Sequence, residues 1–290
     1  MRKLFYLFIV AMCATMFTAC SDDDKDPLDD DGEGKEGVIT MVCEDYHYEI
    51  YLGVETFKEG EIITIDWGDG TVEEFKSVKL PESDRKEDYY DSWPEFDEQI
   101  HYAISIDYSA KHEYSSSNPH LITIKGNIKG VIPPEYTTEL DVSKCTALTY
   151  LNCSDELTSL DVSKNTELTH LSCGYNSNLT SLDVSKNTKL TALYCGYSGN
   201  LTSLNVSKNT ALTWLNCGYN NLTSLDVSKN TALTYLNCGH NNLTSAALNQ
   251  IFRDLPQGQP SKSIIYINGN PGSNTCDKSI AKNKGWITKY

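Results

Sequence analysis

The stretch Leu225-Asp-Val-Ser-Lys-Asn-Thr-Ala-Leu-Thr-Tyr-Leu-Asn-Cys238 decides the fold, because four earlier copies of it precede it in the chain. Those copies begin at Leu140, Leu160, Leu182 and Leu204, so successive copies lie 20, 22, 22 and 21 residues apart. A unit of this length is too small to bury its own apolar side and must stack on its neighbours. The sequence therefore predicts a solenoid, whose long regular surface is typical of a binding protein.

Each copy contains one short frame twice. Leu222-x-x-Leu225-x-Val227-x-x-Asn230 is followed by Leu233-x-x-Leu236-x-Cys238-x-x-Asn241. This frame resembles the leucine-rich repeat family in its bacterial form with nested half-repeats. The alternation in Leu-Asp-Val and Leu-Asn-Cys predicts short strands with leucine, valine and cysteine inside, one strand per coil in each of two parallel sheets. Four asparagines are expected to turn the chain, with amides that satisfy backbone groups: Asn165, Asn187, Asn209 and Asn230.

The spacing of the cysteines indicates that they pack in the core of the repeats. Five of the ten cysteines share one repeat position, where a thiol serves as a small apolar filler: Cys153, Cys173, Cys195, Cys217 and Cys238. Their spacing does not fit zinc ligands, and stacked parallel side chains rarely reach disulfide torsions. We expect a ladder of free, buried thiols, and we expect Cys43, Cys145 and Cys276 to be free as well.

The first residues predict export and lipidation. Met1-Arg-Lys is basic, Leu4 to Phe17 is largely apolar, and Phe17-Thr-Ala-Cys20 closes the run. A run this short indicates a signal peptide, here residues 1–19, rather than a membrane-spanning helix. Because it ends on cysteine, it resembles a bacterial lipoprotein signal, although Phe17 departs from the usual aliphatic residue. We expect lipidation at Cys20, with Cys13 as a weaker competing site.

Residues 20–36 predict an acidic, solvated tether. Ser21-Asp-Asp-Asp also resembles the export signal that sends some Gram-negative lipoproteins to the outer leaflet of the outer membrane; a plain acidic linker is the alternative. We therefore expect an outer-membrane, lipid-anchored, surface-exposed protein. The net charge of −16 should repel phosphate backbones, so nucleic acid is not an expected partner.

Residues 37–130 lack the repeat and predict a small β-sandwich. Strands are expected at Val38–Val42, His47–Leu52, Ile62–Ile65 and Leu121–Ile124 from their β-branched and aromatic content. Asp66-Trp-Gly-Asp-Gly-Thr71, followed by His112-Glu-Tyr114, resembles the PKD family of extracellular β-sandwiches. The segment Pro81–Ile100 is expected to be a loop or an extra hairpin.

Acidic residues and histidines can stabilise turns and sheets or can form metal and catalytic sites. Asp66 and Asp69 are expected to stabilise their turn, with a calcium site or a catalytic pair as alternatives. His101, His112 and His120 have no fixed metal spacing and are expected to be sheet or surface histidines. In the repeats, acidic residues such as Asp161 precede lysines by three positions and predict a solvated polar ladder rather than a calcium face. No nucleophile, base and orienting acid form a recognisable motif, so neither an enzyme nor a cofactor is expected.

The complete fold prediction is a mainly β protein. A PKD-like β-sandwich (37–130) is followed by a leucine-rich-repeat solenoid of about five 21-residue coils (131–245) and a small α/β C-terminal cap (246–290). The cap should contain a helix over Ser245–Leu255, a strand at Ile264–Ile267 and a closing element at Ile280–Trp286. The sandwich, or its strand Leu121–Ile124, should cover the other end of the solenoid.

Three repeat positions are expected to form an outward face rich in aromatic rings. Between and beyond the leucines lie polar, small and aromatic residues, including Ala192, Asn152 and Asp155. Aromatic rings with polar tips suit protein interfaces and sugar stacking, although tyrosine is also simply a favourable strand residue. The candidate ligand-binding residues are Tyr150, His170, Tyr175, Tyr194, Tyr197, Trp214, Tyr219, Tyr235 and His240.

These patterns predict a non-enzymatic recognition or adhesion protein. Its expected partner is a host or neighbouring-cell surface protein that binds the leucine-rich-repeat face, as in the internalin-like proteins it resembles. The alternative is a glycan-binding lipoprotein that assists polysaccharide capture, with Trp214 and the tyrosines stacked on sugar rings. Neither the identity of the ligand nor the oligomeric state follows from the sequence.

Overall fold

The computed structural model describes residues 36–44, 49–78, 103–104, 110–115, 118–153, 156–260 and 262–290, which all lie in the unit Gly34–Tyr290. Several sequence predictions concern residues outside these ranges: the signal segment 1–19, Cys13, Cys20, the tether up to residue 35, the segment Pro81–Ile100, His101 and Asp155. Those statements remain predictions.

The first of two sheets is antiparallel and has the strand order β4-β3-β7-β1-β9. Its strands are β1 (Gly37–Cys43), β3 (Ile62–Asp66), β4 (Val72–Lys76), β7 (His120–Gly126) and β9 (Thr137–Asp141). Three of the strands expected in this region are confirmed. The strand β9 contains Leu140 and Asp141, so the first repeat copy begins inside this sheet.

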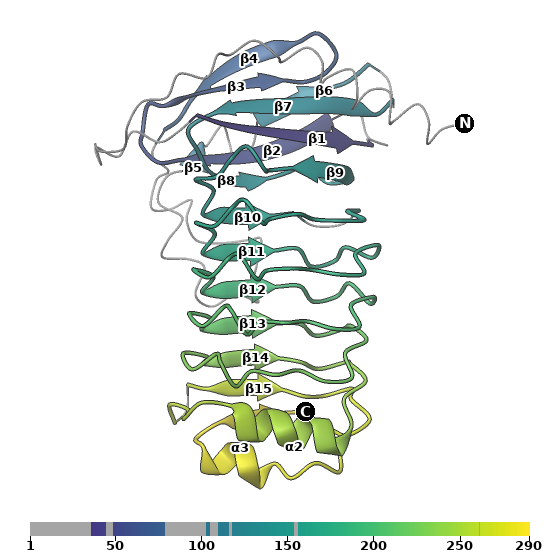
Figure 1. The fold of residues 1–290 in the computed structure, drawn as a ribbon. Coiled ribbons are helices and arrows are strands. Elements are labelled where there is room, and N and C mark those ends of the chain that lie inside the picture. Colours follow the sequence, from purple (N-terminus) through teal and green to yellow (C-terminus); the bar gives the residue numbers. More distant parts are fainter. Residues whose placement is uncertain are drawn as a thin grey trace. The chain divides into compact units, whose positions relative to one another are not determined.

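The second sheet has the order β16-β15-β14-β13-β12-β11-β10-β8-β2-β5, and β6 also pairs with β2 (Figure 1). Neighbours from β8 to β16 are parallel, whereas β2 pairs antiparallel with β5, β6 and β8. The N-terminal members are β2 (Glu49–Thr56), β5 (Ala103–Ile104), β6 (Ala110–Glu113) and β8 (Ile128–Ile132). The repeat members are β10 (Tyr150–Asn152), β11 (His170–Ser172), β12 (Ala192–Tyr194), β13 (Trp214–Asn216) and β14 (Tyr235–Asn237). The last two are β15 (Ile264–Tyr266) and β16 (Ile287–Lys289).

The parallel stack is therefore longer than the five coils expected from the repeated phrase. The strands β10 to β14 come from the five copies, and β8, β15 and β16 extend the stack in the same register. These outer strands lack the Leu-Asn-Cys phrase but bury aliphatic residues in its place, among them Val131 and Ile265. Residue 130 lies within β8, so one continuous sheet crosses the position where the sandwich was expected to end.

The prediction of two strands in every coil is wrong. In the second to fifth copies the Leu-Asp-Val segment is extended but contains no strand, and a turn follows it directly. The side chain of the aspartate, or of Asn205 in the fourth copy, stabilises this turn, because it accepts a hydrogen bond from the backbone N–H two residues later, as between Asp183 and Ser185 at 2.9 Å. Each of these coils thus contributes one strand to the long sheet.

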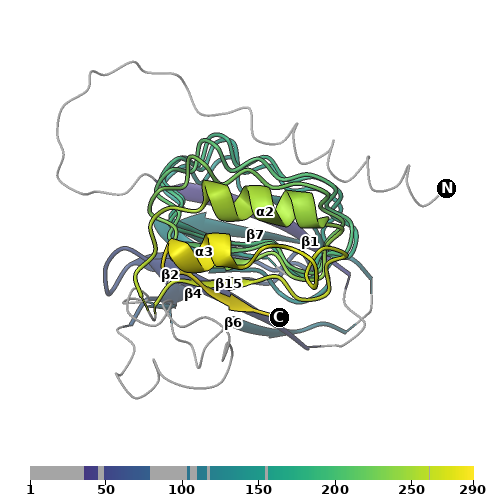
Figure 2. The same ribbon diagram turned by 90° about the horizontal axis from the view of Figure 1, so that it is seen from below.

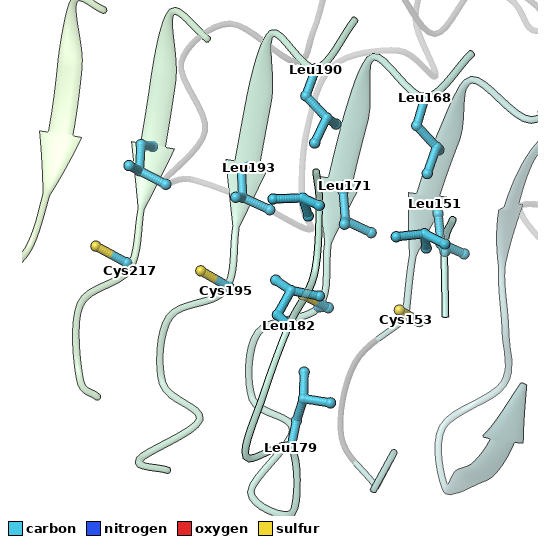
Figure 3. Close-up of a cluster of buried hydrophobic side chains, with 14 of the residues drawn as sticks. Leu151, Cys153, Leu168, Leu171, Leu179, Leu182, Leu190, Leu193, Cys195 and Cys217 are labelled. Atoms are coloured by element: carbon cyan, nitrogen blue, oxygen red, sulfur yellow. The ribbon is translucent and has the colours of Figure 1, made fainter. Parts of the chain in front are cut away.

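The interior of the coils is filled by aligned leucines, valines and thiols (Figure 3). Leu151, Leu171 and Leu193 are fully buried, and each fully buried leucine contributes about 1.5–3 kcal/mol. The repeat cysteines form no disulfide and are buried, as expected, and the same holds for Cys43 and Cys145; Cys276 forms no disulfide and is half-buried. Burial raises the pKa of the Cys153 thiol to about 12, so this thiol stays protonated and behaves as an apolar side chain.

Asparagine ladders connect successive coils. Asn187 is fully buried, and its Nδ2 donates to the backbone oxygens of Val162 at 2.9 Å and Asn165 at 2.8 Å, both in the preceding coil. Asn165, Asn209 and Asn230 make the equivalent pairs of bonds. The predicted role of these asparagines is confirmed, because their amides donate to backbone carbonyls of the preceding coil. In a second sheet, backbone N–H groups of a neighbouring strand would supply such bonds.

The C-terminal end of the stack is covered by α2 (Ser245–Asp254) and α3 (Ser279–Asn283). Figure 2, viewed from below, shows the coils superimposed with both helices in front of them. Leu248, Ile251 and Phe252 of α2 are buried against the last coils, and Trp286 is buried with its indole N–H donating to the oxygen of Pro256. The predicted helix and strand of the cap are confirmed, and the closing element is the short α3.

The other end of the stack is continued by β8 and β2 of the sandwich. Residues of the sandwich and of the repeats belong to one hydrophobic cluster, which includes both Ile128 and Leu151. The predicted cover strand Leu121–Ile124 lies in β7 of the other sheet instead. Among the described residues, neither helix has the length and apolar character needed to cross a membrane.

Candidate binding surface

Four of the candidate residues form a continuous stack of rings, here called the tyrosine ladder: Tyr175, Tyr197, Tyr219 and His240. Each follows the strand of its coil by three residues. The ring centroids of Tyr175 and Tyr197 are 4.9 Å apart, those of Tyr197 and Tyr219 are 4.2 Å apart, and those of Tyr219 and His240 are 3.9 Å apart. Interplanar angles of 13–17° make the rings nearly parallel. The ladder is therefore a single surface built by successive coils.

The backbone of the ladder is unusual, because all four residues have positive φ, between 51° and 61°. Bulky residues rarely adopt this conformation, which glycine and asparagine tolerate best. In the next coil Gly269 occupies the same place with a φ of 71°. The backbone N–H of His240 donates to the oxygen of Asn268, the residue before Gly269, just as that of Tyr219 donates to the oxygen of Gly239. The ladder ends there because glycine has no ring, and the imidazole of His240 lies over Gly269.

The glycine before each ladder residue has a different function. Gly174, Gly196, Gly218 and Gly239 do not have positive φ. A Cβ on Gly174 would lie 1.9 Å from the ring of Tyr194, and a Cβ on Gly218 would lie 2.9 Å from the side-chain oxygen of Asn237. These glycines are required because side chains of the next coil pack directly against their Cα atoms. Sequence reasoning did not distinguish the two positions.

The ladder exposes ring edges and hydroxyl groups. Tyr175 is 49% exposed, Tyr197 41% and Tyr219 39%, the largest exposures among aromatic residues of the repeats in the described chain. Stacking covers the faces of the inner rings, so the edges and the phenolic oxygens meet solvent. Partial burial and the neighbouring phenols raise the pKa of Tyr197 above its ordinary value, so its hydroxyl remains neutral and can both donate and accept hydrogen bonds.

The candidates on the strands themselves lie in a second row. Tyr150, His170, Trp214 and Tyr235 start successive strands of the sheet, with Ala192 between them. The ring centroid of Trp214 lies 4.9 Å from that of Tyr235 and 6.2 Å from that of Tyr194. Tyr194 in turn connects this row to the ladder, because its ring centroid lies 5.9 Å from that of Tyr175.

Two strand candidates are not exposed as expected. Trp214 and Tyr194 are each 4% exposed and form a buried cluster with Ala192. The expectation that these two rings point into solvent is wrong, because strands of adjacent coils place large rings against one another. They support the surface from beneath and do not offer free ring faces. Tyr150, His170 and Tyr235 are half-buried.

His170 is a strand candidate whose pKa is strongly lowered. Desolvation, with a smaller contribution from the charge of Lys129, lowers the pKa of its imidazole to about 4. Its Nδ1 lies 2.9 Å from the hydroxyl oxygen of Thr169. The side chain is therefore neutral at physiological pH and contributes no positive charge to the surface.

The histidine and aspartate motif of the sandwich forms a packed structural cluster. His112 stacks on Trp67 at 4.8 Å, and the hydroxyl of Tyr114 donates to the backbone oxygen of Trp67 at 2.7 Å. Asp69 accepts from the N–H of Thr71 at 2.9 Å, as Asp66 does from that of Gly68 at 3.0 Å, which confirms the predicted turn chemistry.

The carboxylate of Asp69 also pairs with His112 at 2.9 Å. Desolvation alone would raise the pKa of Asp69, but the bonds from His112 and Thr71 lower it to about 2. No group of three metal-ligating side chains occurs in the described part of the chain. The cluster stabilises the hairpin that carries Asp66 and Asp69.

The opposite edge of the coils carries the predicted polar ladder. Hydrogen bonds from Ser163 lower the pKa of Asp161, and bonds from Ser228 lower that of Asp226. The nearby Lys164 and Lys229 lower these values further. The carboxylates are thus committed to their own turns. These aspartates lie in the turns after the Leu-Asp-Val segments, whereas the tyrosine ladder lies in the turns after the strands.

Comparisons with known proteins found similar solved structures only. No protein-family model matches the sequence, and neither does any curated protein. The functional domain of InlJ from Listeria monocytogenes, which includes a cysteine ladder, is 40% identical over 50% of this chain and 35% of its own, with a TM-score of 0.42.

Two further structures are more distant. The internalin InlF from Listeria monocytogenes strain 4b F2365 is 21% identical over 51% of this chain and 43% of its own, with a TM-score of 0.42. The leucine-rich repeat domain of APL1B is 23% identical over 44% of this chain and 43% of its own, with a TM-score of 0.35. The chain thus spans less than half the length of each of these structures.

Proposed function

We propose that this protein is a non-enzymatic recognition or adhesion protein, and that it binds a host or neighbouring-cell surface protein through the tyrosine ladder. The observation that carries this proposal is the placement of Tyr175, Tyr197 and Tyr219 at positive φ. A glycine or asparagine would satisfy the turn at lower conformational cost, as Gly269 does in the next coil. Bulky aromatic residues at three successive turns therefore indicate selection for the rings themselves.

The chemistry of the ladder suits a protein partner. Tyrosine supplies a large contact area and a polar tip while losing few rotamers on binding, and it is enriched among residues that dominate interface energies. Stacking fixes the rings before binding, which reduces the ordering cost further. The tyrosine hydroxyls can pair with backbone groups of a partner.

Glycan capture is the second candidate, and the ring geometry favours it less. A sugar packs its C–H face on the face of an aromatic ring, but Tyr197 and Tyr219 have both faces covered by ladder neighbours. Trp214, the residue expected to stack on sugars, is buried. Exposed edges and hydroxyls leave hydrogen bonding as the main contact that the ladder offers.

We further propose that the protein is anchored at Cys20 to the outer membrane and exposed on the cell surface. The sequence Met1–Cys20 and the acidic segment that follows it support this location. In this arrangement the sandwich, which is PKD-like in its Trp67, Asp69, His112 and Tyr114 cluster, lies between the anchor and the repeats along the chain.

The proposal is tested by replacing all three ladder tyrosines with asparagine: Tyr175→Asn, Tyr197→Asn and Tyr219→Asn. The substitutions remove about 0.5–1.5 kcal/mol of stacking energy per ring pair. Asparagine tolerates positive φ better than tyrosine does, so the lower backbone strain offsets part of this loss. The triple variant should remain folded. Capture of proteins from the surfaces of candidate partner cells should fall at least tenfold relative to the unchanged chain.

The matched control is Tyr51→Ala, which removes a tyrosine of β2 that is 54% exposed but lies outside the ladder. This variant should capture the same proteins as the unchanged chain. Equal capture by the triple variant, with its thermal unfolding preserved, would refute the ladder as the contact surface. Protease treatment of intact cells tests the location, since a protected chain contradicts surface exposure.

A further inference from the structure

A hollow of about 500 Å³ lies at the C-terminal end of the tyrosine ladder. Five asparagines belong to its lining, together with Gly269, Ser273 and Tyr290: Asn241, Asn242, Asn268, Asn270 and Asn274. Its volume falls within the usual range for small-molecule sites, about 300–1,000 Å³. This concentration of amides was not among the sequence predictions.

The fold uses some of these amides and leaves others available. Asn241 and Asn270 are buried and bond to backbone groups of two coils, so they shape the floor of the hollow. Asn268 bonds to the Nε2 of His240 at 2.8 Å and orients that ring. Asn242 has only a long contact of 3.3 Å to the side chain of Asn221, and Asn274 is exposed without a hydrogen bond to another described residue.

Tyr290 supplies the aromatic surface that the ladder lacks. Its ring is 77% exposed, and the ammonium group of Lys278 lies 4.0 Å from the ring centroid on one side. That cation holds the ring in place by its attraction to the π-system. No aromatic ring stacks on Tyr290 among the described residues, so a ring face is open to a ligand, unlike the inner faces of the ladder.

The chemistry of the hollow is polar and uncharged. No lysine, arginine, aspartate or glutamate lines it, although these four residue types make up 22% of the chain. The neighbouring turns 174–178, 196–200, 218–221 and 239–242 also contain no charged residue. The ammonium group of Lys278 beside Tyr290 is a charged group next to the hollow, and the lining itself supplies no acidic or basic side chain to pair with a charged ligand. Amides that donate and accept, beside an open aromatic face, match a ligand with many hydroxyl groups and apolar C–H faces.

We propose that this hollow binds a neutral saccharide, with Asn242 and Asn274 hydrogen-bonded to its hydroxyls and Tyr290 packed against one sugar ring. The site is separate from the tyrosine ladder and takes a different class of ligand. It does not depend on capture of a protein partner, and either activity can exist without the other.

The test uses the full-length chain on an array that carries neutral oligosaccharides, N-acetylated oligosaccharides and acidic oligosaccharides. The strongest neutral binder is then titrated by calorimetry. Binding to neutral sugars is expected, and Tyr290→Ala and Asn274→Ala should each weaken it about tenfold, because each removes one direct contact. The double variant should bind at least 30-fold more weakly.

Two controls separate this site from others. Asn283→Ala removes an exposed asparagine of α3 that does not line the hollow, and it should leave the affinity unchanged. The triple ladder variant should also keep its sugar affinity while it loses protein capture, so the two proposals fail independently. Thermal unfolding confirms that Tyr290→Ala remains folded. The proposal is overturned if no neutral sugar binds, if only acidic sugars bind, or if the double variant retains full affinity.

Discussion

Replacement of Asn187 tests whether the inner asparagines join the coils by donating hydrogen bonds. In Asn187→Ala, two bonds to Val162 and Asn165 are lost, each with a net contribution of about 0.5–1.5 kcal/mol. Both carbonyls keep one backbone donor, from Asn165 and Leu168, which limits the penalty. Removal of the buried amide adds a small cavity. We expect a loss of about 2–3 kcal/mol in the free energy of unfolding.

Asn187→Asp is the sharper perturbation, because it keeps the shape and removes the donor. An ionised carboxylate would face two carbonyl oxygens without water, at a cost of several kcal/mol. Burial therefore raises the folded pKa of the introduced carboxyl above its unfolded value of about 3.9. For an acid with a raised folded pKa, stability falls as pH rises through the unfolded value. A rise of about 3 pKa units corresponds to about 4 kcal/mol lost between pH 4 and pH 7.

The measurement is urea unfolding at pH 4 and pH 7, followed by both circular dichroism and tryptophan fluorescence because repeat arrays can unfold in parts. Asn205→Asp is the matched control in the same coil. Its side chain is exposed and accepts from the N–H of Ser207 at 3.0 Å, and Asp183 already occupies the equivalent position. This control should change stability by less than about 0.5 kcal/mol. Equal effects of the two substitutions at pH 7, or no pH dependence in Asn187→Asp, would refute the reasoning.

Two further predictions concern single side chains. Because the pKa of His170 is lowered to about 4, the unfolded chain binds a proton at higher pH than the folded chain does. The free energy of unfolding should therefore fall by up to about 3 kcal/mol as the pH drops from 7.5 to 4. In urea titrations His170→Gln should reduce this pH dependence, and an unchanged pH dependence contradicts the assignment. Ser198 is buried with its hydroxyl unpaired, at the position where Asn176 and Asn220 bond to backbone groups of two coils. Ser198→Asn should therefore stabilise the chain by about 1 kcal/mol and raise its thermal midpoint, whereas the reverse change Asn176→Ser should lower it; a destabilised Ser198→Asn shows that this turn cannot accept the amide.

The core could be predicted from the sequence because its rule is periodic. A leucine, a cysteine and an asparagine that recur at the same place must meet the same environment in every coil, so the buried thiols and the amide pairs follow from spacing alone. The second set of strands was predicted by the same alternation and is absent. Alternation reports which side chains face inward, but it does not report that Asp183 stabilises a turn through its own backbone contact.

The ladder and the buried aromatic row depend on contacts between coils, which a single repeat does not contain. In Cys173-Gly-Tyr175 the glycine is the obvious candidate for positive φ, yet the tyrosine adopts it. Only the position of Tyr194 in the next coil explains why position 174 must lack a Cβ. Likewise, nothing in the third strand alone indicates that Tyr194 and Trp214 cover one another. Neighbour packing, rather than local preference, decides which aromatic rings reach solvent.

The variable length of the coils supports the separation between scaffold and binding surface. The leucine that follows each repeat cysteine comes 4, 6, 6, 5 and 5 positions later, so all length variation falls just after the ladder residue. Ring distances along the ladder nevertheless remain between 3.9 and 4.9 Å. The backbone N–H of each ladder tyrosine donates to the glycine oxygen of the next coil, for example Tyr197 to Gly218 at 2.9 Å, and that of His240 donates to the oxygen of Asn268. These bonds fix each ring before the chain reaches the variable segment. Insertions can therefore change the rim beside the rings without disturbing their stacking. A surface constructed in this way can alter its specificity while its aromatic centre stays in place.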